Sequence, residues 1–179
     1  MNKRQLYGIK KLPTKEMLGQ QSNLGWCYAN GTGVEKDEQK AVEWYQKAAG
    51  QEHAGAQYNL GVCYANGTGV EKNKEKAVEW YQKAAEHKQG YTNAQYNLGW
   101  CYANGFGVEK NGQKAVEWYQ KAAEQGYTNA QCNLGWCYAN GFGVETNKQR
   151  AVECIKWQLN KDILMHNIIL VGVMQMDLE

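Results

Sequence analysis

The sequence predicts an all-α fold, a right-handed α-α superhelix (solenoid) of four helix-turn-helix repeats. A segment of about 36 residues recurs four times in the 179-residue chain, a period typical of stacked helix pairs. Within each segment the apolar residues follow helical spacing. The chain has one proline, which a mostly helical protein tolerates because proline breaks helix interiors.

The chain divides into a leader, a repeat array and a tail. Residues 1–14 form a basic leader that we expect to be poorly ordered, and residues 15–160 carry the repeats. Residues 161–179 are apolar, and we expect them to cap the last repeat as a helix; a strand or an unstructured tail is the alternative. The repeats are predicted to span residues 20–55, 56–93, 94–129 and 130–160.

The first helix of each repeat, helix A, is predicted over residues 56–65 in the second copy. Ala56 and Leu60 are four residues apart and therefore lie on one face. Gly61 has no side chain and recurs in every copy, which suggests a close approach of the neighbouring helix. An Asn-Gly pair that contains Gly67 ends the helix, as these residues do at C-caps.

The second helix of each repeat, helix B, is expected to start after a capping side chain. The expected caps are Asp37, Asn73, Asn111 and Asn147. In the second copy, Trp80, Tyr81 and Ala84 belong to an apolar stripe of amphipathic width. Glu79 and Lys83 face outward four residues apart, as part of a solvated face.

This pattern closely resembles the Sel-1-like repeats, which are relatives of the tetratricopeptide repeats. The matching residues of the second copy are Ala56, Leu60, Gly61, Tyr64, Gly67, Gly69, Val70, Lys76, Ala77, Trp80, Ala84 and Ala85. The resemblance covers about residues 20–156. It implies an α-solenoid in which helix A lines a concave side and which serves as an adaptor or scaffold for other proteins.

The chain departs from the family pattern in two ways. In the fourth copy, Cys154 and Ile155 replace the tryptophan and tyrosine of helix B, so the packing of that copy is altered. A cysteine-rich secreted branch of the family staples each helix pair with two cysteines and has been linked to β-lactam binding. Here Ala48, Ala84 and Ala122 stand where the partner cysteine is expected. The resemblance therefore does not carry β-lactam binding over to this chain. A β-lactam-binding or hydrolysing member of that branch is kept as an alternative function, and a repeat fragment without a specific ligand is another.

Four of the six cysteines occupy equivalent repeat positions, at separations of 36, 38 and 36 residues. Equivalent positions in stacked helices lie roughly 8–10 Å apart, whereas a disulfide needs Cα atoms within about 7 Å. The same spacing prevents the four from converging on one zinc ion. We therefore expect reduced, half-buried thiols at Cys27, Cys63, Cys101 and Cys137.

A polar and aromatic set of helix A side chains projects away from the core face. Asparagine offers one acceptor and two donors, which suits a peptide amide, and tryptophan supplies rigid contact area. The copies differ little here, which favours a repetitive or extended ligand. The alternative is that the tryptophans pack between A helices and the asparagines bond local backbone. The candidate groove residues are Asn23, Trp26, Tyr58, Asn59, Tyr96, Asn97, Trp100, Asn133 and Trp136.

The sequence favours a non-catalytic scaffold that binds extended peptide or protein segments in a concave groove. His53, His87 and His166 are scattered and do not pair at catalytic or metal-ligand spacing, so we expect no enzyme activity, cofactor or metal. A net charge of +2 gives no case for nucleic acid. No apolar run approaches the roughly 20 residues of a membrane span, and no signal peptide precedes the repeats, so we expect a cytoplasmic protein that binds no membrane.

Overall fold

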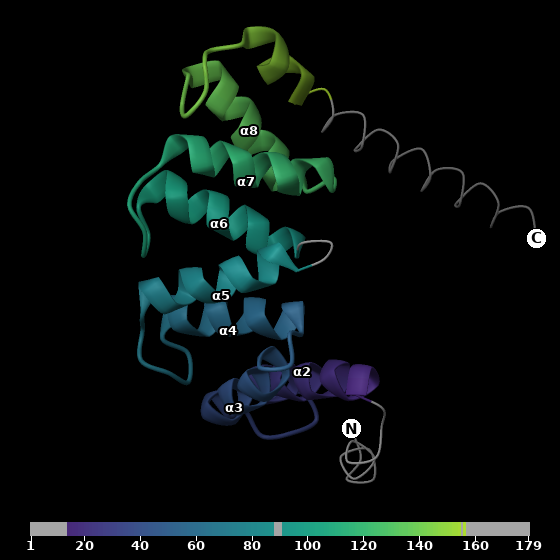
Figure 1. Ribbon diagram of the computed structural model, residues 1–179. Helices are drawn as coiled ribbons and strands as arrows, with labels where there is room; N and C mark the ends of the chain where they lie inside the picture. The colour runs from purple at the N-terminus through teal and green to yellow at the C-terminus, as the bar shows by residue number, and fades with distance from the viewer. Residues whose placement is uncertain (1–13, 88–90, 155, 157–179) are drawn as a thin grey trace, which may run out of the picture. The chain divides into compact units, whose positions relative to one another are not determined.

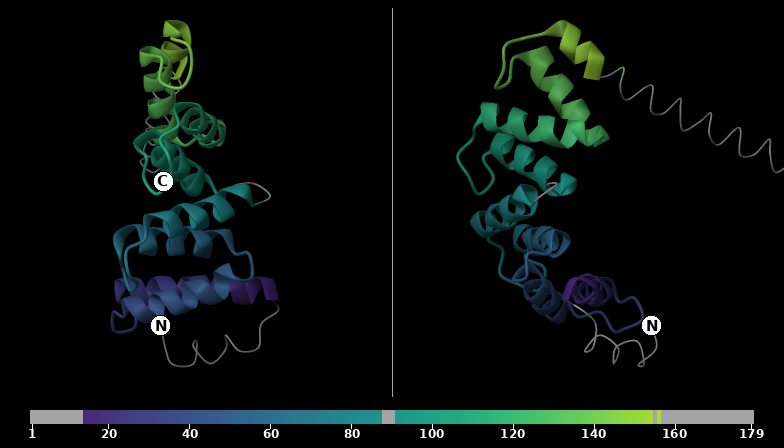
Figure 2. Two further views of the ribbon diagram at one scale, coloured as in Figure 1. Left: turned by 60° about the vertical axis from the view of Figure 1, so that its left-hand side comes forward. Right: turned by 45° about the vertical axis from the view of Figure 1, so that its right-hand side comes forward.

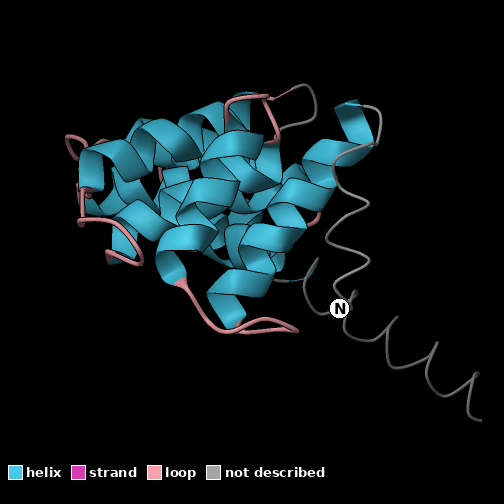
Figure 3. Ribbon diagram, turned by 90° about the horizontal axis from the view of Figure 1, so that it is seen from below, coloured by secondary structure: helices cyan, strands magenta, loops and turns pink. Residues whose placement is uncertain are grey.

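The structure is a computed structural model that describes residues 14–87, 91–154 and 156. Every regular element among these residues is an α-helix (Figure 3). The predicted cap at residues 161–179 and all but the last residue of the predicted leader lie outside the described residues.

The helices follow the expected A–B alternation. Residues 148–154, which belong to helix B of the fourth repeat, are also helical. In chain order the labelled helices are α2 (Thr14–Asn30), α3 (Glu38–Ala49), α4 (Ala54–Asn66), α5 (Lys74–Glu86), α6 (Thr92–Asn104), α7 (Gly112–Glu124) and α8 (Thr128–Asn140). The even-numbered helices are the A helices, and α3, α5 and α7 are B helices.

The chain forms two compact units, Met1–Lys110 and Asn111–Glu179. In the first unit, α2 packs against α3, α3 against α4, α4 against α5 and α5 against α6 (Figures 1 and 2). In the second unit, α7 packs against α8. Consecutive packing of helix pairs is the arrangement of an α-solenoid, so the predicted fold class is confirmed.

The expected caps begin the B helices. The side-chain oxygen of Asp37 accepts a hydrogen bond of 2.9 Å from the backbone N–H three residues later, and Asn73 accepts one of 2.7 Å. Asn111 and Asn147 do the same at 3.0 and 2.9 Å. Each bond satisfies a donor that the first turn of a helix leaves without an intrahelical partner.

Gly61 allows α5 to lie close to α4. A Cβ atom at Gly61 would lie 2.6 Å from two ring carbons of Tyr81 and 3.2 Å from the Ala77 carbonyl oxygen. Gly25 has the same relation to Tyr45 in the first repeat. The close approach that the sequence suggested is therefore made chiefly by a buried tyrosine ring of helix B in the same repeat.

The turn glycine Gly69 joins one repeat to the previous one. Its φ of +69° is a left-handed conformation that suits glycine, and a Cβ atom there would overlap the backbone of Glu38, the first residue of α3. Val70, which follows it, packs against the apolar core beside α3 and α4. Gly107 and Gly143 meet the first residues of α5 and α7 in the same way, so the turns of the second, third and fourth repeats fit against the start of the preceding B helix.

A buried glutamine links each B helix to the following A helix. Gln57 is 5% exposed, and its Nε2 donates a 3.3 Å hydrogen bond to the carbonyl oxygen of Ala49 at the end of α3. Gln95 and Gln131 make the equivalent bonds at 3.5 and 3.3 Å. These bonds satisfy carbonyl groups that the end of a helix leaves without intrahelical donors.

The outward faces of α3, α5 and α7 each pair a lysine with a tryptophan ring. The Nζ of Lys83 lies 4.2 Å from the ring centroid of Trp80 on α5, a cation–π contact. Lys47 and Lys121 lie over the equivalent rings of α3 and α7 at 4.4 and 4.1 Å. The lysines are exposed, as expected, and their ammonium groups cover the half-buried rings.

Candidate functional site

The predicted groove residues include three exposed tryptophans near the ends of A helices. Trp26 on α2 is 51% exposed, Trp100 on α6 is 42% exposed and Trp136 on α8 is 57% exposed. Among the described residues, the other exposed large hydrophobic side chain is Val152. Their exposure shows that these three tryptophan side chains lie outside the apolar core.

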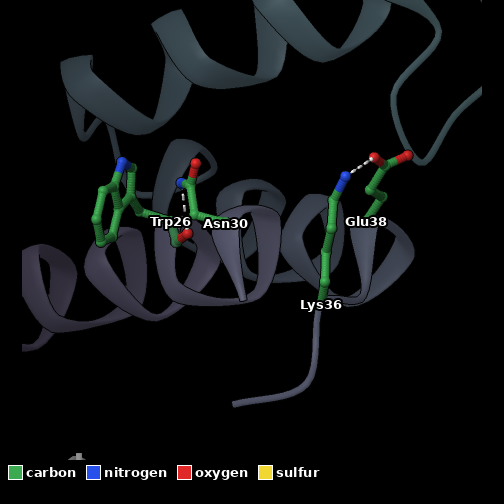
Figure 4. A network of polar contacts seen from close by, with 4 residues as sticks. All are labelled: Trp26, Asn30, Lys36 and Glu38. Atoms are coloured by element: carbon green, nitrogen blue, oxygen red, sulfur yellow. Dashed lines mark hydrogen bonds and ion pairs between the residues drawn. The ribbon is translucent and has the colours of Figure 1, made fainter. Parts of the chain in front are cut away.

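The backbone around each tryptophan is fixed by an asparagine of the same helix. Asn30 Nδ2 donates a 2.9 Å hydrogen bond to the carbonyl oxygen of Trp26, and both side chains rise from α2 next to each other (Figure 4). Asn104 donates the same bond to the carbonyl oxygen of Trp100 at 2.8 Å, and Asn140 donates it to that of Trp136 at 2.9 Å. The last turn of each of these A helices is thereby held in place.

Figure 4 also shows the exposed ion pair of Lys36 with Glu38, at 2.8 Å.

In the third and fourth repeats a phenylalanine extends the aromatic surface. The rings of Trp100 and Phe106 have centroids 5.4 Å apart at 57°, and those of Trp136 and Phe142 are 5.6 Å apart at 52°. Both geometries are tilted ring contacts of the favourable kind. The sequence analysis did not single out these phenylalanines, although the change from Asn-Gly-Thr to Asn-Gly-Phe between repeats was a visible signal.

In the second repeat, where Val62 replaces the tryptophan, the aromatic groups belong to another cluster. Tyr58 lies 5.9 Å from the ring of Tyr81 and 5.2 Å from that of Tyr91. It is half-buried between α4, α5 and the residue before α6. Tyr58 is therefore part of the packing between helices as well as a candidate groove residue.

A hollow beside these residues, which we name the N-terminal hollow, has a volume of about 610 Å³. It brings together Asn23, Trp26 and Asn59 of the predicted set. Its other lining residues are Leu18, Ser22, Gln51, Glu52, His53, Ala54, Gly55, His87 and Tyr91. Amide, imidazole and phenol groups thus surround an exposed indole.

His53 has a role that the sequence analysis did not assign. Its Nδ1 accepts a 3.1 Å hydrogen bond from the N–H of Ala56, so it caps α4, and the helix begins at Ala54 instead of the expected residue 56. Burial lowers the pKa of His53, and the charge of His87 lowers it further. Both effects keep the capping nitrogen unprotonated.

A second hollow, of about 300 Å³, adjoins Trp100. It is lined by Asn97 and Trp100 of the predicted set, together with Ala65, Asn66, Lys72, Tyr81, Cys101 and Phe106. Burial raises the pKa of the Tyr81 phenol, and the hydrogen bond from the Asn97 side chain opposes part of this rise. The structure thus places five predicted residues around two hollows of the first unit. Tyr96 is half-buried on α6, while Asn133 and Trp136 lie on α8 in the second unit.

The six cysteines are free thiols. Burial raises the pKa of Cys63 to about 11, of Cys101 to about 12 and of Cys137 to about 11. The cysteine pairing of the secreted, β-lactam-linked branch is therefore not formed in this chain. Within residues 14–87, 91–154 and 156, no three His, Cys, Asp or Glu side chains lie close enough to hold a metal ion. No described helix is both long and apolar enough to cross a bilayer.

Helix pairs that stack in chain order and recur at a fixed period define a tandem-repeat α-solenoid. A family model described as Sel1 repeat matches residues 21–53, 54–88, 92–127 and 128–156. The chain therefore belongs to the Sel1 repeat family, whose members generally mediate protein–protein interactions and are typically non-catalytic scaffolds. A comparison with curated protein sequences gives no match.

Solved structures of similar proteins support the same fold. A Sel1 repeat protein from Oxalobacter formigenes is 40% identical over 79% of this chain and 58% of that chain, with a TM-score of 0.73. The protective antigen c5321 of uropathogenic Escherichia coli, which has an SLR fold, is 34% identical over 86% of this chain and 32% of that chain, with a TM-score of 0.79. Helicobacter pylori cysteine rich protein B is 28% identical over 73% of this chain and 92% of that chain, with a TM-score of 0.54. The chain thus spans less than two thirds of the first two proteins.

Proposed function

We propose that this chain is a non-catalytic scaffold whose A helices bind extended peptide segments through their exposed aromatic and amide side chains. The observation that carries the proposal is the exposure of Trp26, Trp100 and Trp136, at 51%, 42% and 57%. Exposed apolar groups with polar neighbours mark interaction sites, and tryptophan is enriched among the residues that dominate binding energy.

The neighbouring polar groups fit a peptide backbone. Asn23 and Asn59 line the N-terminal hollow with Trp26, and Asn97 lines the second hollow with Trp100. Each amide group can accept from a peptide N–H and donate to a peptide carbonyl. Such contacts recognise main chain, and the indole rings supply contact area.

The repetition of the site favours an extended ligand over a compact one. Trp26 and Trp100 stand at equivalent positions of α2 and α6, in the same compact unit. A strand-like peptide presents equivalent groups at regular intervals, about 3.3 Å per residue. The valine at position 62 leaves one interval of this series without an indole.

The experiment selects peptides first and then removes one tryptophan. A random peptide library is panned on the immobilised protein, and dissociation constants of the enriched peptides are measured by fluorescence anisotropy. Truncation of a central interface tryptophan costs about 2 kcal/mol or more, so Trp100→Ala should weaken binding roughly thirtyfold. Because Trp100 is 42% exposed, the variant should lose only its ring contact with Phe106, about 1 kcal/mol or 2–4 °C in Tm.

Val152→Ala is the matched control, since Val152 is 47% exposed and lies outside the predicted set. It should bind the selected peptides as the unmodified protein does. Unchanged affinity of Trp100→Ala would refute the proposal. A fall in its stability of 3–5 kcal/mol, as for a core tryptophan, would also refute it.

A further inference from the structure

The fourth repeat contains a cavity that has not been used in the proposed function. Its volume is about 310 Å³, and Cys154 forms part of its wall. Ala123, Leu134 and Tyr138 supply its apolar lining, and Arg150 is among the polar groups around it. All of these residues belong to the second unit.

The repeat register explains why the cavity exists. Cys154 stands where the other three repeats have a tryptophan, which is Trp80 in the second repeat. Trp80 packs against the core cluster that contains Ala49 and Leu60, and Tyr64 packs against the same cluster.

The cavity walls are the counterparts of the groups that surround this tryptophan. Ala123, Leu134 and Tyr138 of the fourth repeat occupy the positions of Ala49, Leu60 and Tyr64. The cavity therefore occupies the place that an indole ring fills in the second repeat.

The missing ring leaves apolar surface uncovered. Leu134 is 7% exposed, whereas its counterpart Leu60, in the cluster against which Trp80 packs, is 0% exposed. A volume of about 310 Å³ falls at the lower end of the range of small-molecule sites, roughly 300–1,000 Å³. An enclosed cavity lined by apolar side chains can bind benzene; this one combines an apolar floor with polar groups such as Glu153 around it.

We propose that the cavity around Cys154 binds a planar aromatic molecule of indole size. The indole ring of Trp80 in the second repeat indicates the shape and size of a molecule that would fit this cavity, because it fills the equivalent place. Arg150 gives one wall a fixed orientation, since its Nη1 donates a 3.1 Å hydrogen bond to the Tyr138 hydroxyl and its guanidinium lies 5.4 Å from the Tyr138 ring centroid. A guanidinium beside the cavity also favours an aromatic face.

The inference is independent of the peptide-binding proposal. None of the residues that line this cavity belongs to the predicted groove set. Either proposal can fail while the other stands.

The test uses 5-fluoroindole and the full chain. Its ¹⁹F resonance should broaden and shift saturably when protein is added, and unlabelled indole should reverse the effect. Cys154→Trp places in the cavity the residue that the other repeats carry, so it should weaken binding at least tenfold while raising Tm. Equal binding by Cys154→Trp and the unmodified protein, or no binding by either, overturns the proposal.

Two further variants make the result specific. Val152→Trp adds the same residue to the same helix at an exposed position outside the cavity lining, and it should bind 5-fluoroindole normally. The second variant is Trp157→Ala. Trp157 lies outside the described residues, and its position in the fourth repeat corresponds to that of Lys83 in the second, whose Nζ lies over the Trp80 ring. Binding that is detected only after Trp157→Ala would mean that the chain supplies its own ring, and it would overturn the proposal of an external ligand.

Discussion

Replacement of Gly61 by alanine tests the packing that joins the two helices of a repeat. A Cβ atom at Gly61 would lie 2.6 Å from two ring carbons of Tyr81, which is 4% exposed. Overpacking of this kind costs about 1–3 kcal/mol. Alanine in place of glycine within a helix gains about 1 kcal/mol from propensity. Since two rigid ring atoms are displaced, we expect the upper part of the range to apply and Gly61→Ala to lose roughly 1–2 kcal/mol net.

Gly19→Ala is the matched control for this prediction. Gly19 also lies within an A helix, but a Cβ atom there would meet nothing within 4 Å. It should therefore gain up to about 1 kcal/mol from propensity alone. The free energies of unfolding of both variants are measured by urea denaturation, with the slope m compared to that of the unmodified chain. If Gly61→Ala is as stable as Gly19→Ala, the close contact with Tyr81 does not restrict this position.

Three further predictions concern caps, thiols and pH. Asn73→Ala should lose about 1 kcal/mol, or roughly 2–4 °C in Tm, because a first-turn N–H loses its acceptor, whereas Asn73→Asp should keep its stability. In the native protein a thiol reagent should modify the exposed Cys132 first. Burial raises the pKa of Cys101 to about 12, so this thiol should react only on unfolding. Rapid labelling of Cys101 in the native protein would contradict its burial. The pKa of His53 is lowered below 6.5, first by burial, so the unfolded chain binds this proton more readily. Its contribution to the free energy of unfolding is therefore full above pH 6.5 and is lost as the pH falls through the folded-state pKa. His53→Asn, which can still cap α4, should show a smaller loss of stability between pH 7.5 and pH 5 in urea titrations.

Features that depend on neighbouring residues of one repeat could be predicted from the sequence. The caps Asp37 and Asn73 act over three residues, and the apolar stripe of α5 follows from helical spacing alone. Gly67 ends α4 in the left-handed conformation expected of a C-cap. These features need only the geometry of a single helix, so a periodic sequence determines them.

Features that depend on how one repeat meets the next could not be derived in this way. The hydrogen bond from Gln57 to Ala49 joins α4 to α3, and Gly69 fits against the start of α3. The contact of Phe106 with Trp100 lies within one repeat, but it depends on how the turn after α6 folds back over the helix, which helical spacing does not give. The period sets the order of the helices, but it does not set their distance or rotation about the solenoid.

Differences between the repeats carry more functional information than their shared residues. The tyrosines and alanines shared by the first three repeats, such as Tyr81 and Ala84, are buried and hold these three helix pairs together in the same manner. By contrast, the residue before α4 is His53, whereas the residue before α6 is Tyr91. The imidazole of His53 caps α4 and lines the N-terminal hollow. Cys154 in place of a tryptophan opens a cavity in the fourth repeat. Because the remaining repeats act as internal controls for these positions, exchanging a residue for its counterpart in another repeat separates a contribution to the fold from a contribution to binding.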